Sequence, residues 1–383
     1  MRTLNAAAEA STPAQAPADD GVRHAAWFAI LAGTPRDTPM WPALFAGFEL
    51  LRLIDHGIAR PGWRRPGLHR SRDARAAVKL VRYHPAHPLL ERVLQAIDRD
   101  SQSGITLVDA LAAYASQLDG DGLRAVAEDV YETAARVGYA RHVPGMAARV
   151  YVGWARCRRE LDRCQDADAT IAAGLDLARQ ADDVITELTL QISHACLAMH
   201  QGCFETAATR LDEVLARAAA LDLPEIEAIA SHDRGVCAHE LGRPARALEY
   251  YERAFLHHAT PAGRMRVIND IGRAFAELDH HDSARAACIT VHLEHADAGV
   301  RHAATINLID LARREGRADT LNHYIHDLAA ERLSARLQAA YDRHVRGAAE
   351  RALDRTLTDC DVARIDRLVR AVRDFSRQHD IRL

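Results

Sequence analysis

The sequence predicts an all-α protein built as a solenoid of stacked helical pairs. Six turn residues recur with spacings of 40, 40, 40, 37 and 37 positions: Gly122, Asp162, Gly202, Gly242, Asp279 and Gly316. A fixed period of this length is typical of helical-pair repeats. Hydrophobic residues make up 48% of the 383-residue chain and aromatic residues only 5%, which favours helices over sheets.

Small residues mark the predicted helix crossings on both sides of each turn. Seven positions before the turns stand Ala115, Ala155, Ala195, Gly235, Gly272 and Ile309, and five positions after them stand Ala127, Ala167, Ala207, Ala247, Ala284 and Leu321. Small side chains at a crossing let two helix axes approach closely. A helical pair cannot bury its apolar face alone, so neighbouring pairs are expected to share one continuous core.

This pattern resembles the tetratricopeptide repeat (TPR) family. The fourth unit carries the family's small–Gly–Ala–Tyr–Ala signature, and the residues are Gly235, Gly242, Ala247, Tyr251 and Ala254. The 40-residue period is longer than the usual period of about 34 residues and is similar to long-helix bacterial variants. The resemblance implies a right-handed α-α superhelix, a TPR-like solenoid with an N-terminal helical extension and C-terminal capping helices.

Four regions are expected along the chain. Residues 1–22 are rich in alanine, proline and serine and are expected to be a disordered tail. Residues 23–100 are expected to form an N-terminal helical region, residues 101–330 the repeats and residues 331–383 the capping helices. Thr358 or Asp359 is expected to cap a last helix. The apolar stretch from Trp41 to Ile54 must be buried, either on the first repeat or in a homodimer through the N-terminal helices.

Composition narrows the function classes. A formal net charge of −4 does not favour general polyanion binding, so nucleic acid is an unfavoured partner. No apolar run is long enough to span a bilayer, and the seven cysteines show no CxxC spacing. We therefore expect a bacterial cytoplasmic protein without a membrane partner.

Motifs for catalysis or cofactor binding were not found. The sequence contains no GxSxG, P-loop, GxGxxG or HExxH, so we predict no enzyme, no cofactor and no metal. One stretch resembles a calcium loop, with Asp119, Asp121 and Glu128 as ligands around Gly122. Its first ligand position is Gln117, and the repeat already requires a turn at Gly122, so we favour the turn.

A basic segment lies between residues 58 and 82. Its candidate contact residues are Arg60, Trp63, Arg64, Arg65, Arg70 and Arg72. They could contact nucleic acid or an acidic partner, or form a solvated loop that pairs with acidic repeats. No DNA-reading motif accompanies them, so we favour the solvated loop.

The resemblance places a partner-binding groove on the first helices of the repeats. The candidate residues stand thirteen, ten, six or three positions before the turns: Arg149, Arg156, Arg159, His232, His239, Arg266, Asn269, Arg273 and Arg313. Arginine binds carboxylates and asparagine can hold a peptide backbone. We predict a non-catalytic scaffold for a protein or an extended acidic peptide, used in regulation or complex assembly. The alternatives are a peptide-responsive signalling regulator similar in layout to Rap-type regulators, or a nucleic-acid-associated regulator acting through residues 58–82.

Overall fold

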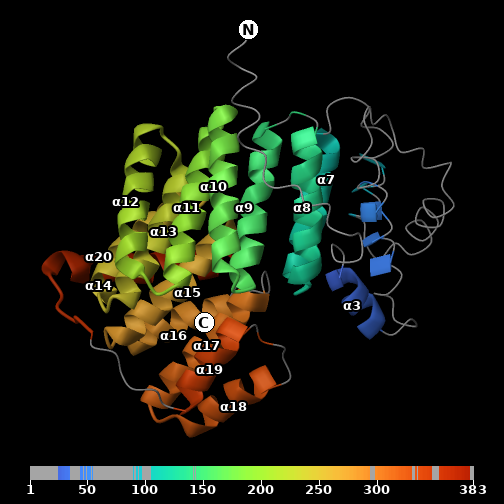
Figure 1. The fold of residues 1–383 in the computed structure, drawn as a ribbon. Helices are drawn as coiled ribbons and strands as arrows, with labels where there is room; N and C mark the ends of the chain where they lie inside the picture. Colours follow the sequence, from blue (N-terminus) through green and yellow to red (C-terminus); the bar gives the residue numbers. More distant parts are fainter. Residues whose placement is uncertain are drawn as a thin grey trace. The chain divides into compact units, whose positions relative to one another are not determined.

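The computed structural model describes residues 25–34, 105–140, 144–293, 298–329, 335–346 and 353–379, with scattered positions within 44–54 and 89–96 and at 142 and 333. Every regular element in these ranges is an α-helix, which confirms the predicted fold class (Figure 1). The expected disordered tail 1–22 and the basic segment 58–82 lie outside the described residues. The chain divides into two compact units, residues 1–187 and 188–383, which we describe separately.

Unit 1 holds the first helical pairs. Its helices are α3 (Ala25–Gly33), α7 (Ile105–Gly120), α8 (Arg124–Ala140), α9 (Pro144–Glu160) and α10 (Cys164–Gln180). From α7 to α10 each helix packs on the next, and α7 also contacts α9. Leu44, Phe48, Leu51 and Ile54, from the apolar stretch, are buried in one cluster with Trp27 and with residues of α7 and α8. The chain itself therefore buries these side chains.

Unit 2 holds the later pairs and the C-terminal helices. α11 (Val184–His200) begins in unit 1 and continues here, followed by α12 (Phe204–Ala220), α13 (Pro224–Glu240), α14 (Pro244–His257), α15 (Pro261–Glu277), α16 (His281–Leu293), α17 (Ala298–Arg314), α18 (Ala318–Ala329), α19 (Ala335–Arg346) and α20 (Asp359–Gln378). Consecutive helices from α12 to α18 pack on one another. The first helices α13, α15 and α17 also contact in series, as expected for a solenoid.

The turns follow the predicted positions. All six predicted turn residues have positive φ, from 59° at Asp162 to 81° at Gly122. The turn at Gly122 shows the hydrogen bonds of a Schellman motif, since Gly122 N donates to Asp119 O at 3.0 Å and Leu123 N donates to Leu118 O at 2.8 Å. Positive φ also occurs at His142, Asp182 and Asp222, in the turns between pairs. Helices of 17 residues and three-residue turns alternate from α8 to α13. Each 40-residue period therefore consists of two such helices and two such turns.

The predicted crossings are close-packed. The alanines five positions after the first five turns are fully buried: Ala127, Ala167, Ala207, Ala247 and Ala284. In the fourth unit, a Cβ atom added to Gly235 would lie 2.4 Å from Tyr251 Cε1. The Tyr251 ring is 1% exposed. Glycine at this crossing is therefore what allows the tyrosine ring to lie against α13.

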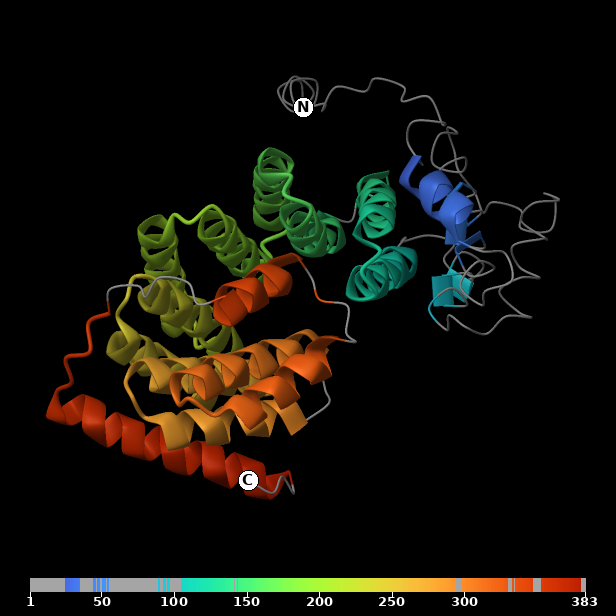
Figure 2. The same ribbon diagram turned by 90° about the horizontal axis from the view of Figure 1, so that it is seen from below.

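The last helix begins where the sequence indicates and packs on the outer helices of earlier pairs. Thr358 caps α20 and forms a capping box with Asp361. The helix then contacts α14 and α16, both second helices of their pairs (Figure 2). α19 packs on α17 instead. Among the described helices, none has both the length and the apolar character needed to cross a membrane.

Candidate binding surface on the first helices

A chain of polar side chains links three successive first helices of unit 2. His232 Nε2 on α13 lies 2.8 Å from Asp270 Oδ2 on α15. Asn269 Nδ2 donates to Asp270 Oδ1 at 3.2 Å, and Asn307 Nδ2 on α17 donates to Asn269 Oδ1 at 3.0 Å. We call these four residues the polar chain. Each contact fixes the orientation of the next side chain, so the groups are pre-organised.

Two further polar contacts join α13 and α15. Arg273 Nη2 on α15 lies 2.6 Å from Glu240 Oε1 on α13. His239 Nε2, in a fully buried side chain, lies 2.7 Å from Glu277 Oε2. Burial alone would lower the pKa of Arg273, but the charge of Glu240 raises it above its ordinary value. These contacts lock α13 to α15 beside the polar chain.

The predicted arginines of unit 1 are all paired with carboxylates. Arg149 Nε lies 3.2 Å from Asp183 Oδ2, and Arg156 Nη2 lies 2.9 Å from Asp119 Oδ2. Arg159 Nη2 lies 3.0 Å from Glu160 Oε1. In unit 2, Arg313 similarly lies 3.3 Å from Asp310. His232, His239, Asn269 and Arg273 are brought together on α13 and α15. Arg266 is exposed on α15, and its charge acts on His232.

The sequence interpretation missed the acidic members of this surface. Asp233, Glu240, Asp270 and Glu277 stand beside or near the predicted positions on the same helices. Cys196 Sγ on α11 donates to Asp233 Oδ2 at 3.2 Å, which extends the contacts to a fourth first helix. Most of these partners are 37 or 38 residues apart, close to the repeat period. A search for complementary polar pairs at that separation would have found them.

In the structure, two of the proposed calcium ligands contact arginines instead. Asp119 contacts Arg124 and Arg156, while Glu128 contacts Arg158 and Arg163. Both carboxylates therefore join helices through arginine. Within the described part of the chain, no group of histidine, cysteine and acidic side chains has the arrangement of a metal site.

The His232–Asp270 pair is expected to make stability depend on pH. Burial alone would lower the pKa of His232, but the hydrogen bond and charge of Asp270 raise it above 6.5. Burial alone would raise the pKa of Asp270, but His232 and Arg273 lower it below 3.8. A raised histidine pKa stabilises the fold fully below pH 6.5, and this contribution is lost as pH rises through the folded-state pKa. We expect the difference in unfolding free energy between wild type and His232→Gln to be larger at pH 6 than at pH 8.

Urea unfolding at both pH values measures this difference. The groups that face His232 are Asp233, Asp270, Arg266, Tyr251 and His258. The pKa of His258 is lowered, first by burial, so its own contribution changes in the opposite direction. Because the charge of His232 also lowers the pKa of His258, the comparison is made in a His258→Gln background, which isolates His232. A difference that stays constant or grows between pH 6 and pH 8 would contradict the assigned pair.

Comparison with known proteins supports the fold. No protein-family model matches the chain, and no curated protein matches it. Among solved structures, the chain is similar to the crystal structure of NprR in complex with its cognate peptide NprX, with a TM-score of 0.50 and 14% sequence identity. The match covers 97% of this chain and 96% of the NprR chain. At this identity the similarity shows the helical-repeat fold.

Proposed function

We propose that this chain is a non-catalytic, TPR-like cytoplasmic regulator that binds a peptide, or an extended segment of a protein, across the first helices of unit 2. The polar chain of His232, Asp270, Asn269 and Asn307 is the observation that carries this proposal. Packed helices lie about 8–10 Å apart, and an extended peptide advances about 3.3 Å per residue. A peptide that crosses α13, α15 and α17 would therefore meet a fixed polar group about every three residues.

The chemistry of the polar chain suits a peptide backbone. Each asparagine amide carries both donors and an acceptor, as a peptide unit does. Asn307 is partly exposed, and the buried Asn269 anchors it. Pre-organised side chains lose less conformational entropy when a ligand binds. The similarity to a solved structure that contains a cognate peptide supports a peptide ligand for this fold.

The charges of the surface favour a peptide of mixed charge. Arg273 is paired with Glu240, so its positive charge is already compensated within the protein. Arg266 is exposed on the same helix, so its side chain can be reached by an acidic group of the ligand. Asp233 lies on the neighbouring helix and suits a basic or hydrogen-bond-donating group. The sequence predicted an acidic peptide. We now propose a peptide that places an acidic group near Arg266 and a hydrogen-bond donor near Asp233.

We expect Arg266→Glu to weaken capture of acidic peptides at least about tenfold, because it replaces an attractive charge by a repulsive one. A displayed random-peptide library, selected against the wild-type protein, would supply the ligands. Fluorescence anisotropy of the selected peptides would then measure affinity. Since the Arg266 side chain is exposed, thermal stability should change little.

The matched control is Arg373→Glu, which makes the same charge change at an exposed position of α20. Its peptide affinity should equal that of wild type. Asn307→Ala should weaken binding regardless of peptide charge, since it removes a backbone contact. Selected peptides that bind Arg266→Glu and Asn307→Ala as tightly as wild type would show that the binding surface is elsewhere.

A further inference from the structure

α20 is held on α14 and α16 by one stripe of side chains. Ile365, Leu368, Val372 and Phe375 are buried in one cluster with residues of α14 and α16. The Phe375 ring meets the Phe255 ring of α14 edge-on, with centroids 6.3 Å apart. Residues more than a hundred positions apart in the sequence are thereby brought into contact.

Polar contacts complete this docking interface. Glu252 of α14 accepts hydrogen bonds from two arginines of α20, Arg364 Nε at 3.2 Å and Arg367 Nε at 2.7 Å. Further along, Thr290 Oγ1 of α16 lies 2.7 Å from Ser376 Oγ. Polar contacts thus hold α20 in place at both ends of its apolar stripe.

The helical state of α20 is also stabilised by contacts within the helix itself. The capping box of Thr358 and Asp361 satisfies backbone N–H groups at its start. Arg364 pairs with Asp361, and Arg377 pairs with Asp374, each three residues apart. Such contacts stabilise a helix without help from neighbours. These contacts favour the helical form of α20 independently of its packing on α14 and α16.

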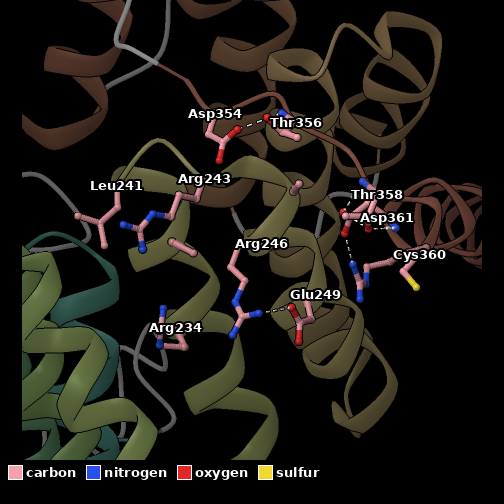
Figure 3. Close-up of a pocket in the computed structure, with 13 residues that line it drawn as sticks. Arg234, Leu241, Arg243, Arg246, Glu249, Asp354, Thr356, Thr358, Cys360 and Asp361 are labelled. Atoms are coloured by element: carbon pink, nitrogen blue, oxygen red, sulfur yellow. Dashed lines mark hydrogen bonds and ion pairs between the residues drawn. The ribbon is translucent and has the colours of Figure 1, made fainter.

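Two polar contacts join the described part of the segment that leads into α20 to earlier turns. Asp354 N donates to Gly242 O at 2.8 Å, and Arg355 Nη1 lies 2.7 Å from Asp279 Oδ2. Between this segment and α13–α14 lies an open cavity of about 620 Å³, which includes Arg243 and Arg246 in its lining (Figure 3). The segment therefore borders a polar cavity, and Leu357 packs against the core cluster just before α20 begins.

One turn of α14 connects this interface to the candidate binding surface. Glu252 and Phe255 contact α20, while Tyr251 in the same turn lies against Gly235 of α13. The Tyr251 ring also meets the His232 ring edge-on, with centroids 5.9 Å apart. A shift of this turn would move Tyr251 against α13. His232, the first member of the polar chain, would then be displaced.

We propose that α20 is a detachable strap whose docking on α14 and α16 controls the order of the polar chain on the first helices. When α20 is docked, the 251–255 turn of α14 is held and the contacts between α13 and α15 stay closed. When α20 is released, the contacts between α13 and α15 break more often. The role of this coupling in peptide binding rests on the proposed function. The coupling itself can be measured in the protein without a ligand.

Hydrogen–deuterium exchange of the full-length chain tests the strap. Arg367→Ala removes the Arg367 contacts to Glu252 and keeps both the apolar stripe and the Arg364–Asp361 pair within α20, so unit 2 should stay folded. We expect amide exchange in α20 and in the 251–255 turn to be about tenfold faster, the factor that corresponds to loss of a charge-assisted contact. Amides near His232 on α13 and near Asp270 on α15 should also exchange several-fold faster, while those of α8 to α10 should not change.

The control is Arg370→Ala, an exposed arginine of the same helix with no ion pair among the described residues. Its exchange pattern should equal that of wild type. Phe375→Ala removes the central apolar contact and should release α20 further. Faster exchange in α20 with no change in α13 and α15 would disprove the coupling. Unchanged exchange of α20 in both variants would disprove a detachable strap. Neither result depends on whether a peptide binds, so failure of the proposed function would be seen separately.

Discussion

Replacing Tyr251 by alanine is expected to destabilise unit 2 by about 3–5 kcal/mol, the range for loss of a buried aromatic side chain. The ring is 1% exposed and fills the space left by Gly235 at the crossing of α13 and α14. Alanine would leave a cavity there, because glycine on the facing helix has no side chain to fill it. Urea unfolding followed by far-UV circular dichroism measures the loss.

The chain contains an internal control for this experiment. All four tryptophans, Trp27, Trp41, Trp63 and Trp154, lie within residues 1–187. Tryptophan fluorescence therefore reports unit 1, and its transition should shift much less than the circular dichroism transition. Tyr251→Phe keeps the ring and should cost under about 1.5 kcal/mol, as shape-conserving changes do. An alanine variant as stable as the phenylalanine variant would show that the ring does not fill this crossing.

Replacing His239 by alanine is expected to cost a similar amount, about 3–5 kcal/mol, since it removes a fully buried ring that lies beside the Glu277 carboxylate. His239 is fully buried, and its ring lies 2.7 Å from the Glu277 carboxylate, whose side chain is 12% exposed. Alanine would leave this carboxylate in the interior without its partner ring. The cost of an unpaired buried charge exceeds the cost of the lost packing.

A double variant separates the charge effect from the packing effect. With leucine at both positions, His239→Leu and Glu277→Leu, no charge is left unpaired, and the loss should be much smaller than for His239→Ala. The double-mutant cycle with His239→Leu and Glu277→Leu alone should give a favourable coupling of at least about 1 kcal/mol. Additive single effects would show that the two side chains do not act as a pair.

The helical-repeat fold was predictable because it depends on local rules that recur at a fixed spacing. Gly122, Gly202, Gly242 and Gly316 adopt positive φ, which glycine tolerates without strain, so a periodic glycine directly marks a turn. Asp162 and Asp279 adopt the same backbone with a short polar side chain. The turns between pairs, at His142, Asp182 and Asp222, carry no glycine, so the periodic glycines did not mark them.

The candidate surface was only partly predictable. Repeat offsets placed His232, Asn269 and Arg273 on the first helices, as the structure shows. The offsets did not reveal the contacts between neighbouring pairs, which join side chains 33 to 38 residues apart. Without those partners, the arginines appeared as a positive surface. With Glu240 and Asp270 in place, the charge is largely compensated.

By itself, the sequence determined the all-α class, the turn positions, the small residues at the crossings, such as Gly235 and Ala247, and the start of the last helix at Thr358 or Asp359. Each of these depends on the backbone preferences or sizes of residues close together in a repeat. Only the tertiary structure decided that α20 returns to α14 and α16, and that Asp270 joins His232 to Asn269. Such contacts join side chains on different helices, and the turn and size pattern within one repeat does not specify which of them meet, because packing in three dimensions brings them together.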